Sequence, residues 1–292
     1  MFPMQPKPLY QVFVATLISA VGGISSAFAD LPSLPEKPWL EYFLVSENRS
    51  FIFAFNNWAG GNLIPAGKGG KEISIQYHLP VTFVIEEVLP TGATVTKKIL
   101  PESLETKDKA TLKPGKISFR GKVTGDASFE GFVEVERGII SVGGRLLDPG
   151  TLTKNPLRFG VRVTVPDVYR NAKKPGKEGA KDAPKDAAKE FAKKIKDDRY
   201  SMVWTDGKRV KFDGTDKIEA DPKNVNGPGI KDLKVEIAPY QGKSLEFSAS
   251  ENSKIALWTR LEQPFSDGFS INWYPDPAKD PETKARLKFT VK

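Results

Sequence analysis

Few side chains in this sequence could perform catalysis, because it contains one histidine, His78, and no cysteine. A Ser-His-Asp triad and most zinc sites need histidine, and thiolate chemistry needs cysteine. His78 lies in the alternating segment 73–79, where it is predicted to face solvent on a strand with Ser74 and Gln76. No nucleotide-binding, serine-hydrolase or zinc-protease motif is present. The sequence therefore favours a protein that is not an enzyme and predicts no cofactor.

Paired carboxylates are a catalytic device that needs neither histidine nor cysteine, and they can hydrolyse glycosides. Glu134 and Glu136 alternate with Val133 and Val135, so they are predicted to line the solvent face of one strand. Because the sequence holds 36 acidic residues, many chance pairs are expected. A carboxylate-dependent hydrolase is therefore the weaker alternative function. The other candidate glutamates are Glu86, Glu87, Glu130 and Glu262.

Three aspartates, Asp206, Asp213 and Asp216, form the candidate metal site, which would suit calcium. Calcium takes about six to eight oxygen ligands, and loops supply backbone carbonyls readily. The spacing of an EF-hand loop is absent, however, and Asp-Gly sequences are ordinary turn formers. The sequence thus favours turns at these positions and predicts no metal.

Aromatic side chains beside amides form the candidate ligand-binding surface. Phe55, Asn57 and Trp58 end one predicted strand, and Trp273 and Tyr274 precede an Asp-Pro loop. Aromatic rings can stack on sugar rings while amides hydrogen-bond to hydroxyl groups, a combination of apolar surface and placed polar groups that binding sites use. These five residues are the predicted ligand-binding residues, with a glycan as the candidate ligand.

The alternative is that the aromatic residues belong to the core, where tryptophan and tyrosine fill space and keep a polar tip near the rim. For Trp258, which is flanked by Ala256 and Leu257, the sequence favours the core. For Trp58 both interpretations stay open.

The elements that must position these residues are short strands. Residues 38–165 and 200–292 contain runs that alternate apolar with polar residues, and Gly, Pro, Asn and Asp turn signals separate the runs. Short strands at this spacing are typical of an all-β sandwich or barrel. We therefore predict an all-β protein with two antiparallel β-sandwich domains, residues 30–166 and 200–292. The immunoglobulin-like subtype is preferred and a jelly roll is second.

Residues 167–199 differ in composition and are predicted to form a charged linker between the two domains. Eleven basic residues stand against seven acidic ones in this segment. Its alanines and its oppositely charged residues three to four positions apart favour a short helix at 184–196, with Phe191 and Ile195 as apolar anchors. The basic surplus predicts weak attraction to anionic surfaces through the linker.

The two β regions also resemble each other near their ends. Gly115 and Gly242 each begin a similar strand, and Asp148 and Asp276 each precede a proline before a closing strand. Two explanations are open, a diverged duplication and the incidental likeness of two antiparallel sandwiches. A duplication requires the same strand order in both copies.

Residues 1–29 are predicted to be an export signal. Lys7 precedes an apolar run at 12–20, and Ala27 and Ala29 form an A-x-A cleavage site. The run is shorter than the about 20 residues of a membrane span, so no membrane segment is expected after cleavage, and a retained anchor is the alternative. The signal and the absence of cysteine indicate an exported bacterial envelope protein, either periplasmic or secreted.

The charge pattern argues against nucleic acid as a partner. The net charge is +8, much of the excess lies in residues 167–199, and no basic stripe or nucleic-acid-binding motif is present. The leading hypothesis is a non-catalytic binding or structural-interaction protein of the envelope, with another envelope protein or a glycan as partner. A carbohydrate-binding module that uses exposed tryptophan and tyrosine is the alternative.

Overall fold

The computed structural model describes residues 42–56, 58–66, 75–106, 115–169, 185–215, 229–259 and 268–292. The predicted export signal, residues 170–184 of the predicted linker, and the candidates Asn57, Asp216 and Glu262 lie outside this part of the chain. The described residues are nearly all antiparallel β-structure, as the sequence predicts. No helix among them is both long and apolar enough to cross a membrane.

Seventeen strands make up the sheet structure, and one α-helix accompanies them in the described residues. The helix is α2 (Lys185–Ile195), and short 3-10 helices lie at Ile75–Tyr77 and Ala238–Tyr240. The strands are β1 (Tyr42–Glu47), β2 (Phe51–Asn56), β3 (Gly60–Pro65), β4 (Leu79–Val88), β5 (Thr94–Thr96), β6 (Ile99–Thr106), β7 (Lys116–Val123), β8 (Ser128–Glu136), β9 (Ile139–Asp148), β10 (Leu157–Val165), β11 (Arg199–Trp204), β12 (Arg209–Asp213), β13 (Ile230–Glu236), β14 (Ser244–Ala249), β15 (Ser253–Thr259), β16 (Phe269–Pro275) and β17 (Leu287–Val291).

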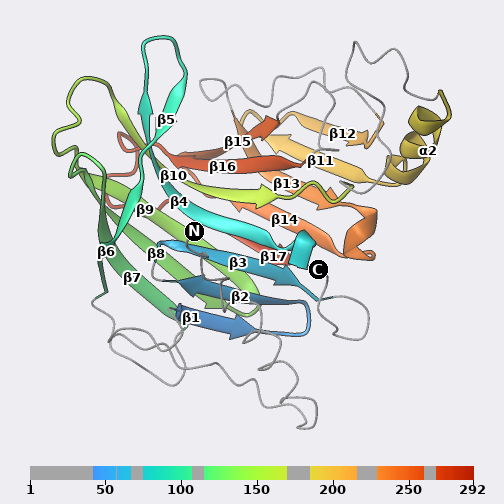
Figure 1. Cartoon of the computed structure of the whole chain (residues 1–292), viewed down its shortest axis with the longest axis horizontal. Coiled ribbons are helices and arrows are strands. Elements are labelled where there is room, and N and C mark those ends of the chain that lie inside the picture. The colour runs from blue at the N-terminus through green and yellow to red at the C-terminus, as the bar shows by residue number, and fades with distance from the viewer. Residues whose placement is uncertain are drawn as a thin grey trace, which may run out of the picture.

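The pairings arrange these strands in two runs, which we call the first and second layers. The first layer has the order β1-β2-β3-β4-β10-β16-β15, with β5 beside the end of β4. The second has the order β6-β7-β8-β9-β17-β14-β13-β11-β12. One residue pair, Ile230 with Ile255, joins β13 to β15, so the layers form one curled sheet (Figure 1).

A phenylalanine-rich core lies between the layers. The burial of β2 and β7 alternates along each strand, so one face packs inward while the other faces outward. Phe119 on β7 reaches across to Phe55 on β2 and Phe83 on β4, with ring centroids 5.3 and 5.0 Å apart. Phe53 on β2 meets Phe289 on β17 at 6.2 Å. Edge-on and tilted contacts of this kind add to the stabilisation that burial provides.

The structure does not divide into the two predicted sandwich domains. Strand β10 from the first region pairs with β16 from the second, and β9 pairs with β17, so strands from both regions share each layer. Neither an immunoglobulin-like nor a jelly-roll sandwich confined to one region describes this order. Alternation shows that a strand is half-buried, but it carries no information about which strand becomes its partner. If strands of the two regions did not pair with each other, each region would leave a row of unpaired backbone N–H and C=O groups at the edge of its sheet.

The pairings also contradict the duplication hypothesis in the form proposed. In the first copy, β7 pairs with β8 and β8 with β9. In the second copy the corresponding β14 pairs with β17, while β15 and β16 lie in the other layer. Because the strand orders differ, incidental likeness of antiparallel strands is the explanation that remains.

Helix α2 coincides with the predicted helix and packs on the sheet. Phe191 and Ile195 are buried, and the Phe191 ring lies 6.0 Å from the ring of Tyr169. Directly after the helix, β11 joins the second layer by pairing with β13. In the order of the chain, α2 stands between β10 of the first layer and β11 of the second, and both strands belong to one curled sheet.

A buried carboxylate holds the segment that follows α2. Asp198 is 1% exposed, and its Oδ1 accepts hydrogen bonds from the Tyr169 hydroxyl at 2.7 Å and the Ala238 N–H at 3.0 Å. Burial raises the pKa of Asp198 despite these hydrogen bonds, which favour the charged form. Burial and the Asp198 carboxylate also raise the pKa of Tyr169, so its hydroxyl remains a donor. Ionised Asp198 therefore costs the folded state free energy.

As the pH rises from about 4 to about 7, the free energy of unfolding of the Asp198→Asn variant is expected to increase relative to that of the wild type. Asparagine keeps an oxygen that can accept both hydrogen bonds, but it cannot ionise. At low pH both side chains are neutral, whereas above the raised folded-state pKa only the wild type holds a buried charge. Urea unfolding at both pH values measures the difference. A difference in unfolding free energy that is independent of pH would contradict this account.

Candidate functional site

The predicted aromatic surface does not form, because most of its members are buried. Phe55 and Trp273 are fully buried in the core, where the Phe55 ring packs on Phe83 and Phe119. Tyr274 is 6% exposed, and its hydroxyl donates a hydrogen bond to Glu86 at 3.1 Å. Burial and the nearby Glu86 raise the pKa of Tyr274. The prediction that these residues offer an exposed stacking surface is wrong.

The exposed tryptophans lie elsewhere. Trp58 is 47% exposed in the β2–β3 turn, where Oδ1 of Asn56 accepts hydrogen bonds from the N–H groups of Trp58 and Gly60. Trp258, predicted to be core, is 51% exposed. Ile255 and Leu257 take the inward positions of β15, so the alternation of the strand turns Trp258 outward.

The candidate calcium site is not assembled. Asp206 lies in the turn between β11 and β12, whereas Asp213 ends β12 beside Arg199. The four-residue step from Arg209 to Asp213 alone spans about 13 Å, so the two carboxylates cannot share an ion. Each instead accepts a backbone hydrogen bond two residues on, from Lys208 and from Thr215. Within the described residues no group of three or more His, Cys, Asp or Glu side chains could hold a metal.

The candidate catalytic groups are also engaged or separated. Glu87 binds Lys97 and Asn155, and these hydrogen bonds lower its pKa. Glu130 pairs with two arginines, and Glu134 and Glu136 lie on β8 as predicted. His78 is half-buried after a 3-10 helix at Ile75–Tyr77, so its prediction as a strand residue is wrong. Glu87 and Glu130 are thus held in ion pairs with basic side chains.

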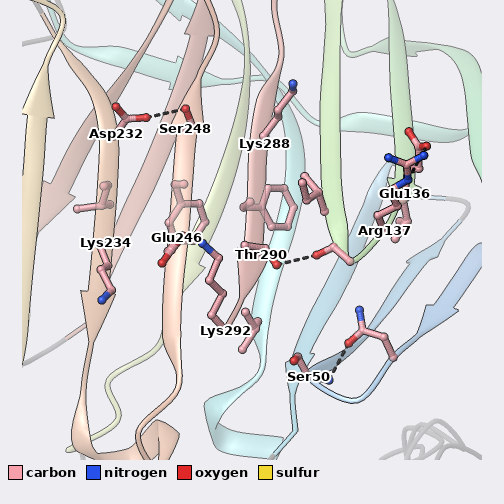
Figure 2. A pocket seen from close by; sticks show the side chains of 18 of the residues that line it. Ser50, Glu136, Arg137, Asp232, Lys234, Glu246, Ser248, Lys288, Thr290 and Lys292 are labelled. Atoms are coloured by element: carbon pink, nitrogen blue, oxygen red, sulfur yellow. Dashed lines mark hydrogen bonds and ion pairs between the residues drawn. The ribbon is translucent and has the colours of Figure 1, made fainter.

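A large groove opens on the described surface. It has a volume of about 1110 Å³ and lies on the outer face of the second layer (Figure 2). Its floor comes from β11, β13, β14 and β17, and its walls come from the β1–β2 and β8–β9 turns. The volume exceeds the about 300–1,000 Å³ of typical small-molecule pockets. The groove therefore suits an extended ligand.

Local chemistry shapes the two turns that wall the groove. Asn48 Oδ1 accepts hydrogen bonds from the N–H groups of Ser50 and Phe51 and so folds the β1–β2 turn. Arg137 and Gly138 both have positive φ, at 51° and 77°, as tight hairpin turns require. The Thr290 hydroxyl on β17 donates a 2.6 Å hydrogen bond to the Gly138 carbonyl and ties this turn to the floor.

The groove lining carries charges of both signs. On the floor, Lys234 lies opposite Glu246, and Ser248 donates a 2.6 Å hydrogen bond to Asp232 (Figure 2). Lys292 approaches Glu246 at 2.5 Å. Two phenylalanines line the groove but are at most 2% exposed, and no tryptophan or tyrosine lines it. The basic lining residues are Arg49, Arg137, Lys234, Lys288 and Lys292, and the acidic ones are Glu47, Glu136, Asp232 and Glu246.

Sequence reasoning missed this groove entirely. Its floor residues are the outward positions of four ordinary strands, for example Asp232 and Lys234 on β13. Their alternation signals a solvent-facing sheet surface, which is the commonest fate of such residues. The groove arises because β17 lies between β14 and β9 and pairs with both, and β9 is far from β17 in sequence. No local pattern encodes that neighbourhood.

Comparisons with known proteins give no family. No protein-family model matches the chain, and no curated protein matches its sequence. Among solved structures, alpha-N-acetylgalactosaminidase NagBb from Bifidobacterium bifidum is similar with a TM-score of 0.49 and 8% identity, over 85% of this chain and 36% of that one. The Slr1438 protein from Synechocystis sp. PCC 6803 has a TM-score of 0.35 and 12% identity, over 92% and 99%. At TM-scores below 0.5, neither likeness indicates what this chain does.

Proposed function

We propose that this chain is an exported, non-catalytic binding protein that holds a segment of a partner polypeptide in the groove of the second layer. The observation that carries the proposal is the lining, in which five basic and four acidic side chains surround one extended depression. Such a lining complements a polypeptide that itself carries both signs of charge. The net charge of this lining is only +1 (five basic minus four acidic residues), which gives a polyanion little attraction, and a neutral glycan finds no exposed aromatic ring among the described lining residues.

The geometry of the groove also suits a polypeptide. The floor crosses β11, β13, β14 and β17, which at about 4.8 Å per strand gives a width of about 14 Å. That width accommodates an extended segment with side chains on both sides. The ion pairs of the floor are solvent-exposed: Lys234 and its partner Glu236, 2.9 Å apart, are 40% and 45% exposed, and Lys292 and Glu246 are 65% and 31% exposed. Exposed pairs contribute little, so a ligand can exchange with them at small cost.

Charge reversal at Lys288 is expected to weaken peptide binding at least tenfold. Peptides are first selected on the full chain from a random-peptide display library, and the dissociation constant of a selected synthetic peptide is measured by calorimetry. Lys288→Glu places a negative charge on the floor, whereas Lys122→Glu, on exposed β7 outside the groove, is the matched control. Loss of affinity in the first variant alone supports the proposal. Failure to select any peptide, or equal binding by both variants, overturns it.

A further inference from the structure

The outer face of the first layer presents a second surface with different chemistry. Cross-strand register places Trp258, Ser270 and Thr164 in one row across β15, β16 and β10. The next row contains Asn272 and Arg162, because residues two positions apart share a face. We call this surface the Trp258 face; its exposed and partly exposed residues are Trp258, Lys254, Arg158, Arg162 and Thr164, while Ser270, Asn272, Tyr274 and Glu86 on the same side are buried. The four strands that carry it can be followed in Figure 1.

A hydrogen-bonded network fixes the polar groups of this face. Glu86, 1% exposed, accepts from Arg162 at 2.7 Å through Oε1 and from Arg158 at 2.7 Å through Oε2. Arg162 also donates from Nε to Asn272 Oδ1 at 2.8 Å. The Arg158 guanidinium stacks 4.0 Å above the Tyr274 ring. Two arginines are thus held rigidly, although the Arg162 side chain remains 31% exposed.

The face carries a positive surplus. Among the described residues, Lys254, Arg158, Arg162 and Lys279 lie on it or at its edge, against two carboxylates, Glu86 and Asp276. The exposed ring of Trp258 adjoins this positive region on the same side of the sheet. An exposed aromatic ring beside fixed cations and the partly exposed Thr164 complements a ligand that is flat and apolar on one side, rich in hydroxyl groups, and negatively charged.

We propose that the Trp258 face binds an acidic glycan, with one sugar ring stacked on Trp258 and the carboxylate of a hexuronate residue held by Arg162 and Lys254. Trp258 and Arg162 lie two strands apart, which separates their backbones by about 10 Å across the sheet. The ligand must therefore extend beyond a single sugar ring. This site goes beyond the groove, because it belongs to the other layer and recognises another class of polymer.

The test measures binding of trigalacturonate and of its neutral methyl ester to the full chain by calorimetry and tryptophan fluorescence. Trp258→Ala is expected to weaken trigalacturonate binding at least tenfold. Trp58→Ala removes an equally exposed tryptophan from the β2–β3 turn and serves as the matched control, with unchanged affinity expected. Esterification is also expected to weaken binding at least tenfold, because it removes the charge that Arg162 and Lys254 recognise.

Three results would overturn the proposal. They are no binding of trigalacturonate, equal loss in the Trp258 and Trp58 variants, and equal binding of the acid and its ester. Lys288→Glu lies in the groove and is expected to leave trigalacturonate binding unchanged. Peptide binding and sugar binding are measured separately, so failure of one site is distinguished from failure of the other.

Discussion

Replacing Glu86 by alanine is expected to lower the free energy of unfolding by about 3 kcal/mol, because the substitution strands two arginines without their buried counter-ion. Glu86 is 1% exposed and binds Arg158 and Arg162, each at 2.7 Å. The Tyr274 hydroxyl loses its acceptor as well. Removing one partner of a buried ion pair costs about 3–5 kcal/mol, and the partial exposure of the two arginines places this case at the lower end.

Glu130→Ala is the matched control for this prediction. Glu130 also binds two arginines, Arg120 at 3.4 Å and Arg145 at 2.8 Å, but on the exposed face of β8. Exposed pairs of this kind contribute about 0–1 kcal/mol. Urea unfolding of both variants and the wild type gives the comparison. Equal losses would show that burial of Glu86 does not determine its contribution.

The strands themselves were largely predictable, because alternation and turn signals are local. Within the predicted β-rich region 38–165, for example, Lys116–Val123 alternates exposed and buried residues and forms β7, and the predicted helix at 184–196 corresponds to α2. Strand β3 (Gly60–Pro65) contains two adjacent glycines, although glycine usually weakens a strand. Gly61 pairs with Phe55, and a Cβ at Gly61 would lie 2.5 Å from the Ala54 carbonyl oxygen, so the close approach of β2 needs a glycine. A glycine read as a turn signal was in fact a packing requirement.

The arrangement of the strands was not predictable, and the candidate sites depended on it. The sequence placed Trp273 at the surface and Trp258 in the core, and the structure reverses both. In a strand, a shift of one position decides which face a side chain occupies, so an uncertain strand start exchanges inside for outside. Trp273 alternates with Phe269 and Ile271, which gives its inward direction once β16 is known to begin at Phe269. The Glu86 network joins residues 72 to 188 positions apart, which no local pattern reveals.

Replacing Phe119 by alanine is expected to cost about 3–5 kcal/mol of unfolding free energy, as is usual for a buried phenylalanine. Phe119 is 2% exposed and its ring contacts three others, those of Phe55, Phe83 and Phe129. Its neighbour on β8 is Gly131, where a Cβ would lie 2.3 Å from the Phe119 ring. The ring therefore fills space that the sequence leaves open for it, and alanine would create a cavity there.

The same variant tests whether the two β regions unfold together. Phe119 belongs to the first region, whereas the buried Trp204 and Trp273 belong to the second. In a background in which Trp39 and Trp58 of the first region are replaced by phenylalanine, tryptophan fluorescence reports on the second region. Because β10 pairs with β16 and β9 with β17, loss of the Phe119 ring is expected to shift the fluorescence transition as far as the circular-dichroism transition. Phe119→Leu, which keeps much of the volume, should shift both transitions by a smaller amount. If fluorescence stayed at its wild-type midpoint while circular dichroism moved, the regions would unfold independently and the shared layers would not be one cooperative unit.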